Sequence, residues 1–177
     1  MLDGENNLTK RAIGGEASAF GLLYNHYQPK IYRFIYFKVG HREEAEDLTH
    51  QVFMKAWTNI REYKSRGFPF GSWLYRIARN QVIDHYRTKK DEGPIETVQN
   101  VVLASTSDLR DLDSKLSIEK IRATILKLKP EYQEVIIMKF VEDLTTKEIA
   151  SALEKSEGAV KLLQHRAIKG LKEMLNN

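Results

Sequence analysis

Apolar residues recur at helical spacing through the first half of the chain. From residue 16 to about residue 88 they are separated mostly by three or four positions, the spacing of one face of an α-helix. The first of them are Phe20, Leu23, Tyr24, Tyr27, Ile31, Phe34 and Ile35. The pattern is interrupted at Pro29, at Gly40 and over residues 66–71, where glycine and proline end one helix before another begins at Ser72. It predicts a bundle of about four helices.

Residues 91–116 do not continue this pattern. The stretch opens on Asp-Glu-Gly-Pro, has no aromatic residue and carries scattered Asp, Ser and Thr. Such a segment cannot bury enough apolar surface to fold by itself. We therefore expect an all-α protein in which a flexible acidic linker joins two small helical domains, over residues 16–90 and 117–177. The composition of the linker allows the domains to pack together or to stay apart.

The second domain begins with two predicted helices and a helix-capping motif. An apolar stripe starts at Ile118 and stops before Pro130, and a further helix is expected from Glu131 to about Val141. Thr145 and Glu148 then have the spacing of a capping box, in which each side chain accepts from the other residue's free backbone N–H. The capping box marks the start of another helix.

That helix is short, ending near Leu153, and Ser156 is a suitable N-cap for the longer basic helix that follows. A short helix, a tight turn and a longer helix form a helix-turn-helix candidate, whose second helix reads the DNA major groove. Helical spacing places Val160, Leu163 and Ala167 on the packing face. The polar positions left to face DNA are Ser156, Glu157, Gly158, Lys161, Gln164, His165, Arg166 and Lys169.

The turn of this motif departs from the usual pattern. Glu154 occupies the position where glycine would relieve a left-handed backbone, so we expect the turn to be distorted. The alternative for the whole motif is an amphipathic helical hairpin that packs against the protein without binding DNA.

Charge divides the chain at the same places. Residues 1–90 carry 15 Lys and Arg against 9 Asp and Glu, residues 91–116 carry 2 against 6, and residues 117–177 carry 11 against 9. Two basic blocks around an acidic one suggest two surfaces for a polyanion, although solvated surface charge is the alternative. The chain has no cysteine, no apolar run near the ~18 residues of a membrane span, and a polar N-terminus. We expect a cytoplasmic protein.

The densest basic stretch, residues 64–90, has seven basic residues and one acid. In the helix predicted from Ser72, the inward stripe is Leu74, Ile77, Ala78 and Gln81. This leaves arginines at the height of DNA phosphates and Asn80 as a partner for a base edge. The candidate DNA contacts are Lys64, Arg66, Arg76, Arg79, Asn80, Asp84 and Arg87. The preceding Phe68-Pro69-Phe70 is either a platform for an unpaired base or a hydrophobic plug. For Phe70 and Trp73 the plug is favoured.

Three segments, in this order, resemble the extracytoplasmic-function (ECF) group of bacterial sigma factors in the sigma-70 family. They are Glu-Ala-Glu-Asp-Leu-Thr-His-Gln-Val-Phe-Met-Lys-Ala-Trp at 44–57, Phe-Gly-Ser-Trp-Leu-Tyr-Arg-Ile-Ala-Arg-Asn at 70–80, and the helices that carry Glu-Ile-Ala at 148–150 and Ser-Glu-Gly-Ala-Val-Lys at 156–161. The resemblance implies that the first segment binds core RNA polymerase, the second melts and reads the minus-ten element, and the third reads the minus-thirty-five element.

The resemblance also implies the partners: core RNA polymerase, through the coiled coil of its largest subunit and its flap, promoter DNA and an anti-sigma factor, with no small-molecule substrate. The implied polymerase contacts are Glu46, Asp47, His50, Gln51 and Lys55. Three positions depart from the family pattern. His50 and Gln51 stand where Gln and an acid are usual, and Leu163 stands where arginine is common.

Two other classes of protein share some of these features. A transcriptional regulator with a helical sensor domain would bind duplex DNA tightly without polymerase. A metal-dependent hydrolase fits poorly, because the five histidines are scattered without a His-x-x-x-His pair and no nucleophile elbow occurs. We therefore expect no catalytic residue, no metal and no cofactor.

Overall fold

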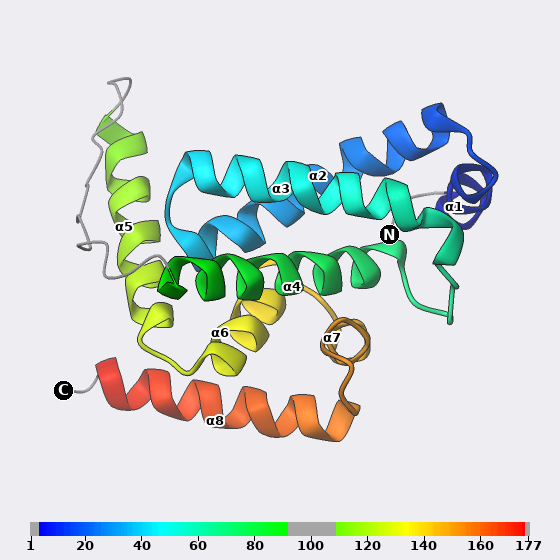
Figure 1. Ribbon diagram of the computed structural model, residues 1–177. Coiled ribbons are helices and arrows are strands. Elements are labelled where there is room, and N and C mark those ends of the chain that lie inside the picture. The colour runs from blue at the N-terminus through cyan, green and yellow to red at the C-terminus, as the bar shows by residue number, and fades with distance from the viewer. Residues whose placement is uncertain (1–3, 92–108, 176–177) are drawn as a thin grey trace.

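The computed structural model describes residues 4–91 and 109–175, and within these ranges all regular structure is helical, as predicted (Figure 1). The first half contains α1 (Glu5–Ile13), α2 (Ala17–Val39), α3 (Arg42–Asn59), the 3-10 turn η1 (Ile60–Glu62) and α4 (Phe70–Asp91). The second half contains α5 (Leu109–Leu126), α6 (Pro130–Ile136), the π-helical turn η2 (Ile137–Val141), α7 (Thr146–Leu153) and α8 (Glu157–Leu175). None of these helices has an apolar stretch long enough to cross a membrane.

The first half is a bundle of α2, α3 and α4, with α1 packed across one end of α2 (Figure 1). Its core comes from the apolar face that the spacing predicted. The fully buried side chains include Leu23, Ile31, Phe34, Ile35, Val52, Leu74 and Tyr75. This burial holds α4 in place and leaves one side of it for other contacts.

The helix boundaries of the first half differ from the prediction in three places. Pro29 lies inside α2 and does not break it, because the buried residues Tyr27 and Ile31 on either side hold the helix across the missing N–H. The helix α1 precedes the predicted start at residue 16. Finally, α4 begins at Phe70 rather than at Ser72.

The predicted linker is shorter than expected, since α5 begins at Leu109 and residues 109–116 are therefore helical. Leucine, arginine and lysine in this segment are good helix formers, and the lack of aromatic residues does not oppose a helix. The rest of the expected linker, residues 92–108, lies outside the described residues.

The helix-turn-helix forms as predicted from its caps. The Thr145 Oγ1 accepts from the Glu148 N–H at 3.2 Å, and the Thr145 N–H donates to Glu148 Oε2 at 2.7 Å. The Ser156 Oγ accepts from the Ala159 N–H at 3.1 Å and so caps α8. The expected capping box and N-cap are both present.

The turn between α7 and α8 is left-handed at Glu154, with a φ of 55°. It is closed in the regular way for a helix end: the Lys155 N–H donates to the Ala150 carbonyl at 3.0 Å and the Glu154 N–H to the Ser151 carbonyl at 3.4 Å. The left-handed residue was expected, whereas the expected distortion of the turn is absent.

The chain widens into a π-helical turn at η2 before α7. There the Glu142 N–H donates to the Ile137 carbonyl at 3.0 Å, one residue further back than in an α-helix. Ile137 and Met138 of this turn are buried.

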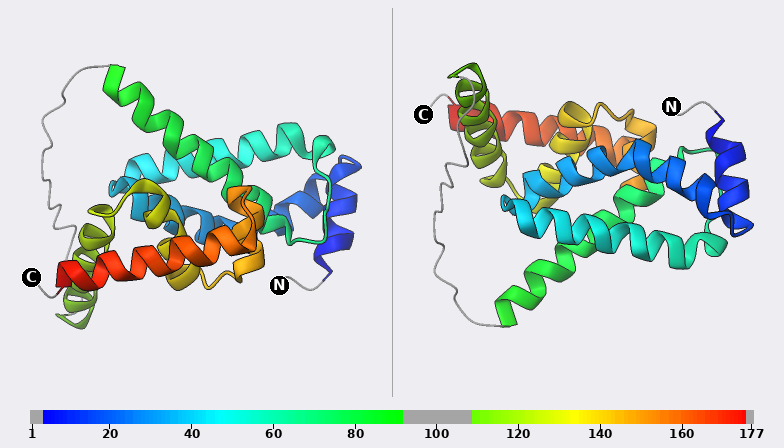
Figure 2. Two further views of the ribbon diagram at one scale, coloured as in Figure 1. Left: turned by 90° about the horizontal axis from the view of Figure 1, so that it is seen from below. Right: turned by 90° about the horizontal axis from the view of Figure 1, so that it is seen from above.

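The two halves pack against each other, which the sequence left open. The helix α7 contacts α4, η2 contacts α2, and α8 lies on the outer side of the second half (Figures 1 and 2). The helices that were predicted to read DNA, α4 and α8, therefore belong to one packed body and both contact α7.

Candidate nucleic-acid interface

The helix α4 buries one face and presents the other. Leu74, Ala78 and Val82 are buried against the bundle, while Arg76 is half-buried and Asn80 is exposed on the opposite side. The predicted orientation of the helix is thus correct. Ile77, which was expected to point inward, is half-buried and lines the cavity described next.

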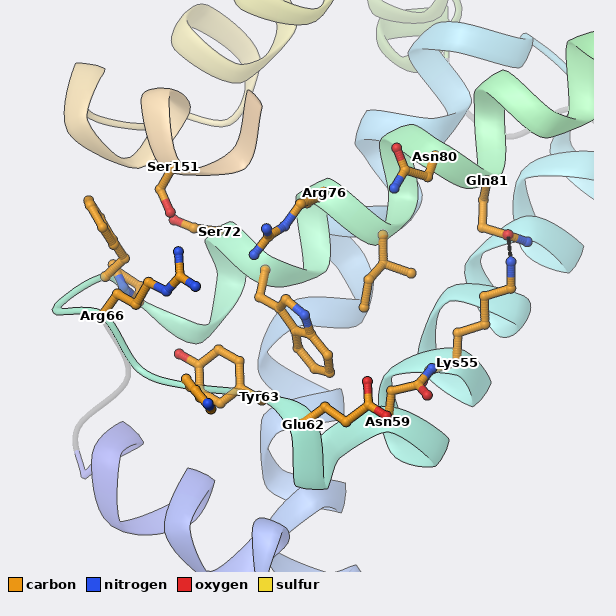
Figure 3. A pocket seen from close by; sticks show the side chains of 15 residues that line it. Lys55, Asn59, Glu62, Tyr63, Arg66, Ser72, Arg76, Asn80, Gln81 and Ser151 are labelled. Carbon is orange, nitrogen blue, oxygen red and sulfur yellow. Dashed lines mark hydrogen bonds between the residues drawn. The ribbon is translucent and has the colours of Figure 1, made fainter. Parts of the chain in front are cut away.

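A cavity of about 450 Å³ opens between the end of α3, the segment that follows η1 and the first turns of α4 (Figure 3). Its wall includes the rings of Tyr63 and Trp73, the guanidinium groups of Arg66 and Arg76, and the amide of Asn80. Aromatic surface beside cations is the combination that binds single-stranded nucleic acid, because bases stack on the rings while phosphates meet the charges.

The aromatic residues around the cavity differ in how deeply they are buried. Phe70 is buried, with its ring centroid 5.2 Å from Tyr63 and 5.4 Å from Trp73, so it is the predicted plug. Trp73 is only half-buried and lines the cavity, so besides packing on Phe70 it forms part of the cavity wall. Phe68 also lines the cavity and lies under the Lys147 ammonium, 5.4 Å from its ring centroid.

The hydroxyl of Ser72 lies at the cavity and lacks a hydrogen-bond partner among the described residues. The residue is 4% exposed. Leaving such a buried group unpaired costs about 1–3 kcal/mol.

Two of the predicted DNA contacts on α4 are occupied by carboxylates of the second half. The Arg76 Nη1 lies 2.7 Å from Glu154 Oε1, and the Arg79 Nε lies 2.8 Å from Glu134 Oε2. Arg87 lies further along the helix, with its Nη2 3.3 Å from Asp84 Oδ1. Of the other predicted contacts, Lys64 and Arg66 are exposed.

A third ion pair between the halves lies deeper. The Arg33 guanidinium donates twice to Glu142, at 2.7 and 2.9 Å, and the Glu142 side chain is fully buried. The Tyr75 hydroxyl donates to the same carboxylate at 3.0 Å. Burial and the neighbouring Glu142 raise the pKa of Tyr75, so the hydroxyl remains a donor. Glu142 is therefore held by three bonds from the first half.

The predicted polymerase-binding residues lie on the outer face of α3, opposite buried Ala45, Leu48 and Val52. The exposed residues are Glu46, Asp47, His50, Gln51 and Lys55. Two of them also contact α4: the Gln51 Oε1 accepts from Gln81 Nε2 at 2.7 Å, and Lys55 donates to Gln81 Oε1. The face of α3 that carries Asp47 and the helix α4 are thus joined through Gln81.

On α8 the predicted packing residues Val160, Leu163 and Ala167 are all buried. All but one of the predicted reading positions are exposed. The exposed ones are Ser156, Glu157, Gly158, Lys161, His165, Arg166 and Lys169. The exception is Gln164, which is half-buried, with its Nε2 buried and without a hydrogen-bond partner among the described residues.

Two features of the site were not predicted from the sequence. One is the pairing of Arg76 and Arg79 with carboxylates, and the other is the position of Tyr63 in the cavity wall. Glu134 is 4% exposed and stands beside buried Val135, so a charged residue within the apolar stripe of a predicted helix was the available signal. No comparable signal marked Tyr63, because it lies between two predicted helices.

Comparison with known proteins adds to this geometry. The model of Sigma-70 region 2 matches residues 23–92, and that of Sigma-70 region 4 matches residues 118–171. The ECF RNA polymerase sigma factor BldN of Streptomyces coelicolor is 37% identical over 95% of this chain, which spans 64% of the length of that relative. The ECF RNA polymerase sigma factor SigW of Bacillus subtilis is 31% identical, with 95% of each chain covered.

A solved structure has the same fold. It is the sigma factor RpoE in complex with the anti-sigma factor NepR, from Bartonella quintana. The similarity covers 89% of this chain and 96% of that one, with a TM-score of 0.67 and 22% sequence identity.

Proposed function

The chain belongs to the extracytoplasmic-function group of the sigma-70 family, and from this premise we propose which of its surfaces carry out transcription initiation. The protein binds core RNA polymerase through α3, holds an unstacked base of the minus-ten element in the cavity beside α4, and reads the minus-thirty-five duplex with α8. The function requires no catalytic group of the chain itself.

The observation that carries this proposal is the cavity at α4. It combines the rings of Tyr63 and Trp73 with the unpaired hydroxyl of Ser72 and the cations Arg66 and Arg76. Stacking of a base on aromatic rings contributes ~1–3 kcal/mol, but only to a base that has left the duplex. A site of this kind favours melted over paired DNA, which is the selectivity that promoter opening needs.

The exposed face of α8 suits duplex DNA instead. Its first turns present Lys161, His165 and Arg166 while the opposite side is buried against α6 and α7. The cations Lys161 and Arg166 can contact phosphates that flank the major groove, and their contribution falls with rising salt. We therefore assign sequence reading of the duplex to this helix.

DNA that lies along α4 must displace the carboxylates that now hold its arginines. Arg76 and Arg79 cannot pair with Glu154 and Glu134 and with phosphates in the same geometry. The conformation that binds the minus-ten element is thus one in which the second half has moved away from α4. RpoE was solved with an anti-sigma factor, and we infer that a partner of that kind also binds this chain.

A reconstituted transcription assay tests the assignment. Core polymerase is incubated with and without the protein, and the transcripts are sequenced to find promoters that depend on it. We expect new, defined start sites. Tight binding of the free protein to duplex promoter DNA, without specific transcripts, would instead favour a regulator with a sensor domain.

Two matched variants separate the surfaces. Asn80→Ala should weaken discrimination at the minus-ten element and leave the affinity for core polymerase unchanged. Asp47→Ala should lower that affinity without altering sequence preference. Each variant serves as the control for the other, and an exchange of their effects would show that the surfaces are misassigned.

A further inference from the structure

Glu5, the first residue of α1, has a buried carboxylate with both oxygens bonded to the first half of the chain. The residue is 6% exposed. Its Oε1 accepts from the backbone N–H of Phe70 at 2.6 Å, and its Oε2 accepts from the Tyr27 hydroxyl at 2.5 Å. A residue near the N-terminus thus contacts the start of α4, 65 positions away.

The bond to Phe70 replaces a cap that the local sequence cannot provide. Phe70 is the first residue of α4, so its N–H has no partner within the helix. The residue before it, Pro69, has no side-chain oxygen to serve as an N-cap. The carboxylate also lies at the positive end of a 22-residue helix, where a negative charge is stabilised. Glu5 is therefore a cap supplied from another helix.

Tyr27 fixes the carboxylate from the other side. A Cβ added to Gly71 would lie 2.4 Å from Tyr27 Cε1, so the ring lies against the first turn of α4 where only glycine fits. Burial, followed by the hydrogen bond to Glu5, raises the pKa of Tyr27, and the hydroxyl therefore stays protonated as a donor. The carboxylate has one position between these two donors.

The residues fixed in this way are next to the proposed base site. The Phe70 ring packs on Trp73, with centroids 5.4 Å apart, and on Tyr63, with centroids 5.2 Å apart. Ser72, with its unpaired hydroxyl, stands two positions after the capped residue. A shift of the first turn of α4 therefore moves the cavity residues Ser72 and Trp73, together with the Phe70 ring on which Tyr63 packs.

We infer that Glu5 is a positioning residue for minus-ten recognition: its carboxylate holds the first turn of α4 in the register that forms the base-binding cavity. This role rests on the proposed function of the cavity. It assigns to α1, which lies outside the matched region 2, a part in reading DNA without contacting it.

The test compares Glu5→Ala with Thr9→Ala in the full-length protein. The Thr9 Oγ1 donates to the Glu5 carbonyl at 2.7 Å and is buried, so its loss weakens α1 but leaves the carboxylate in place. Holoenzyme is titrated with a single-stranded minus-ten oligonucleotide that carries 2-aminopurine, and affinity for core polymerase is measured separately. Hydrogen exchange of the backbone amides of residues 68–73 is followed in the protein without DNA.

For Glu5→Ala we expect about five-fold weaker oligonucleotide binding and about five-fold faster exchange of the Phe70 amide, as for a lost helix cap. Affinity for core polymerase should stay within two-fold of the wild type. Thr9→Ala should change neither oligonucleotide binding nor that amide. Wild-type oligonucleotide affinity in Glu5→Ala overturns the inference, as does an equal loss in Thr9→Ala.

Glu5→Gln decides the question if the alanine variant does not fold. It keeps the size of the side chain and one acceptor oxygen for Phe70, but it has no charge and no second acceptor for Tyr27. We expect about two-fold weaker oligonucleotide binding, and a folded Gln variant without any change overturns the inference. If the wild-type holoenzyme gives no fluorescence change, the proposed base site is wrong, while exchange of the Phe70 amide still reports whether Glu5 caps α4.

Discussion

The two helices proposed to bind DNA, α4 and α8, differ in what their cations contact. On α4, Arg76 and Arg79 pair with carboxylates of the other half, and their side chains are 35% and 30% exposed. On α8, the cations Lys161 and Arg166 are exposed to solvent. In this arrangement the helix proposed to read the duplex is accessible, whereas the helix proposed to read melted DNA is partly covered.

The three ion pairs that cover α4 and the adjoining part of α2 are not of equal strength. Glu142 and Glu134 have side chains 0% and 5% exposed, so removal of an arginine partner would leave a buried charge. Glu154 is 67% exposed, and a pair of this kind contributes about 0–1 kcal/mol. Of these three ion pairs, the two with buried carboxylates are therefore the most costly to break by removing one partner. A ligand that takes over the arginines would leave Glu142 and Glu134 in need of other partners.

The largest expected effect is at Arg33. Arg33→Met leaves Glu142 buried with only the Tyr75 hydroxyl among its side-chain partners described above, and it should lower the free energy of unfolding by about 3 kcal/mol. Urea denaturation measures the change. Arg42→Met is the matched control, because its pair with Glu46 is 79% and 52% exposed and its loss should cost under about 0.5 kcal/mol. Equal losses in the two variants would contradict the ranking of the ion pairs.

Glu134→Gln should make Arg79 of α4 as available to DNA as the exposed cations of α8, with little change in side-chain volume. Arg79 loses its charged partner and becomes available to phosphate, so we expect binding of a single-stranded minus-ten oligonucleotide to strengthen by roughly five-fold, about 1 kcal/mol. Binding of a minus-thirty-five duplex to α8 should not change. Fluorescence titration with each DNA measures both, and unchanged minus-ten affinity would mean that the carboxylate does not compete with DNA.

Substitutions at Glu154 should have a smaller effect and separate backbone strain from charge. Glu154→Gly relieves the left-handed conformation at φ 55° and should raise the free energy of unfolding by up to about 1 kcal/mol. Glu154→Gln keeps the strain and removes only the exposed pair with Arg76, so it should change stability by less than about 0.5 kcal/mol. Thermal unfolding of both variants checks the order, and a larger effect of the Gln variant would reverse the interpretation.

The smallest effect is expected on α8, where no competition has to be removed. Lys161→Ala should weaken duplex binding and reduce the slope of log affinity against log salt by about 0.9, the value for one phosphate contact. Titrations at several salt concentrations measure the slope. An unchanged slope would show that Lys161 does not reach a phosphate, and the same substitution at exposed Lys120 of α5 provides the control.

Much of the fold could be predicted from the sequence because it depends on local rules. The apolar spacing placed the core of the bundle, and the capping residues Thr145 and Ser156 marked the starts of α7 and α8. Local rules failed at Pro29, where packing on both sides keeps the helix continuous, and at α5, which begins inside the expected linker. Both errors came from a local signal that tertiary contacts or helix propensity outweighed.

The candidate site was predictable in its basic residues but not in their partners. Arg76 and Arg79 follow from helical spacing on α4 alone. Their pairing with Glu154 and Glu134 joins residues 78 and 55 positions apart, and it depends on how the two halves pack. The cap from Glu5 to Phe70 could not be predicted for the same reason. Contacts of this range follow only from the assembled fold.

The π-helical turn η2 places a constraint on how this chain can evolve. One residue fewer between Ile137 and Val141 would return the backbone to α-helical pairing and rotate the following positions by about 100°. Glu142 would then turn away from Arg33, although every apolar residue on either side could be kept. A deletion of a single codon here would therefore preserve the composition of the protein while separating its halves, so the length of this turn should be under stronger selection than the identity of its residues.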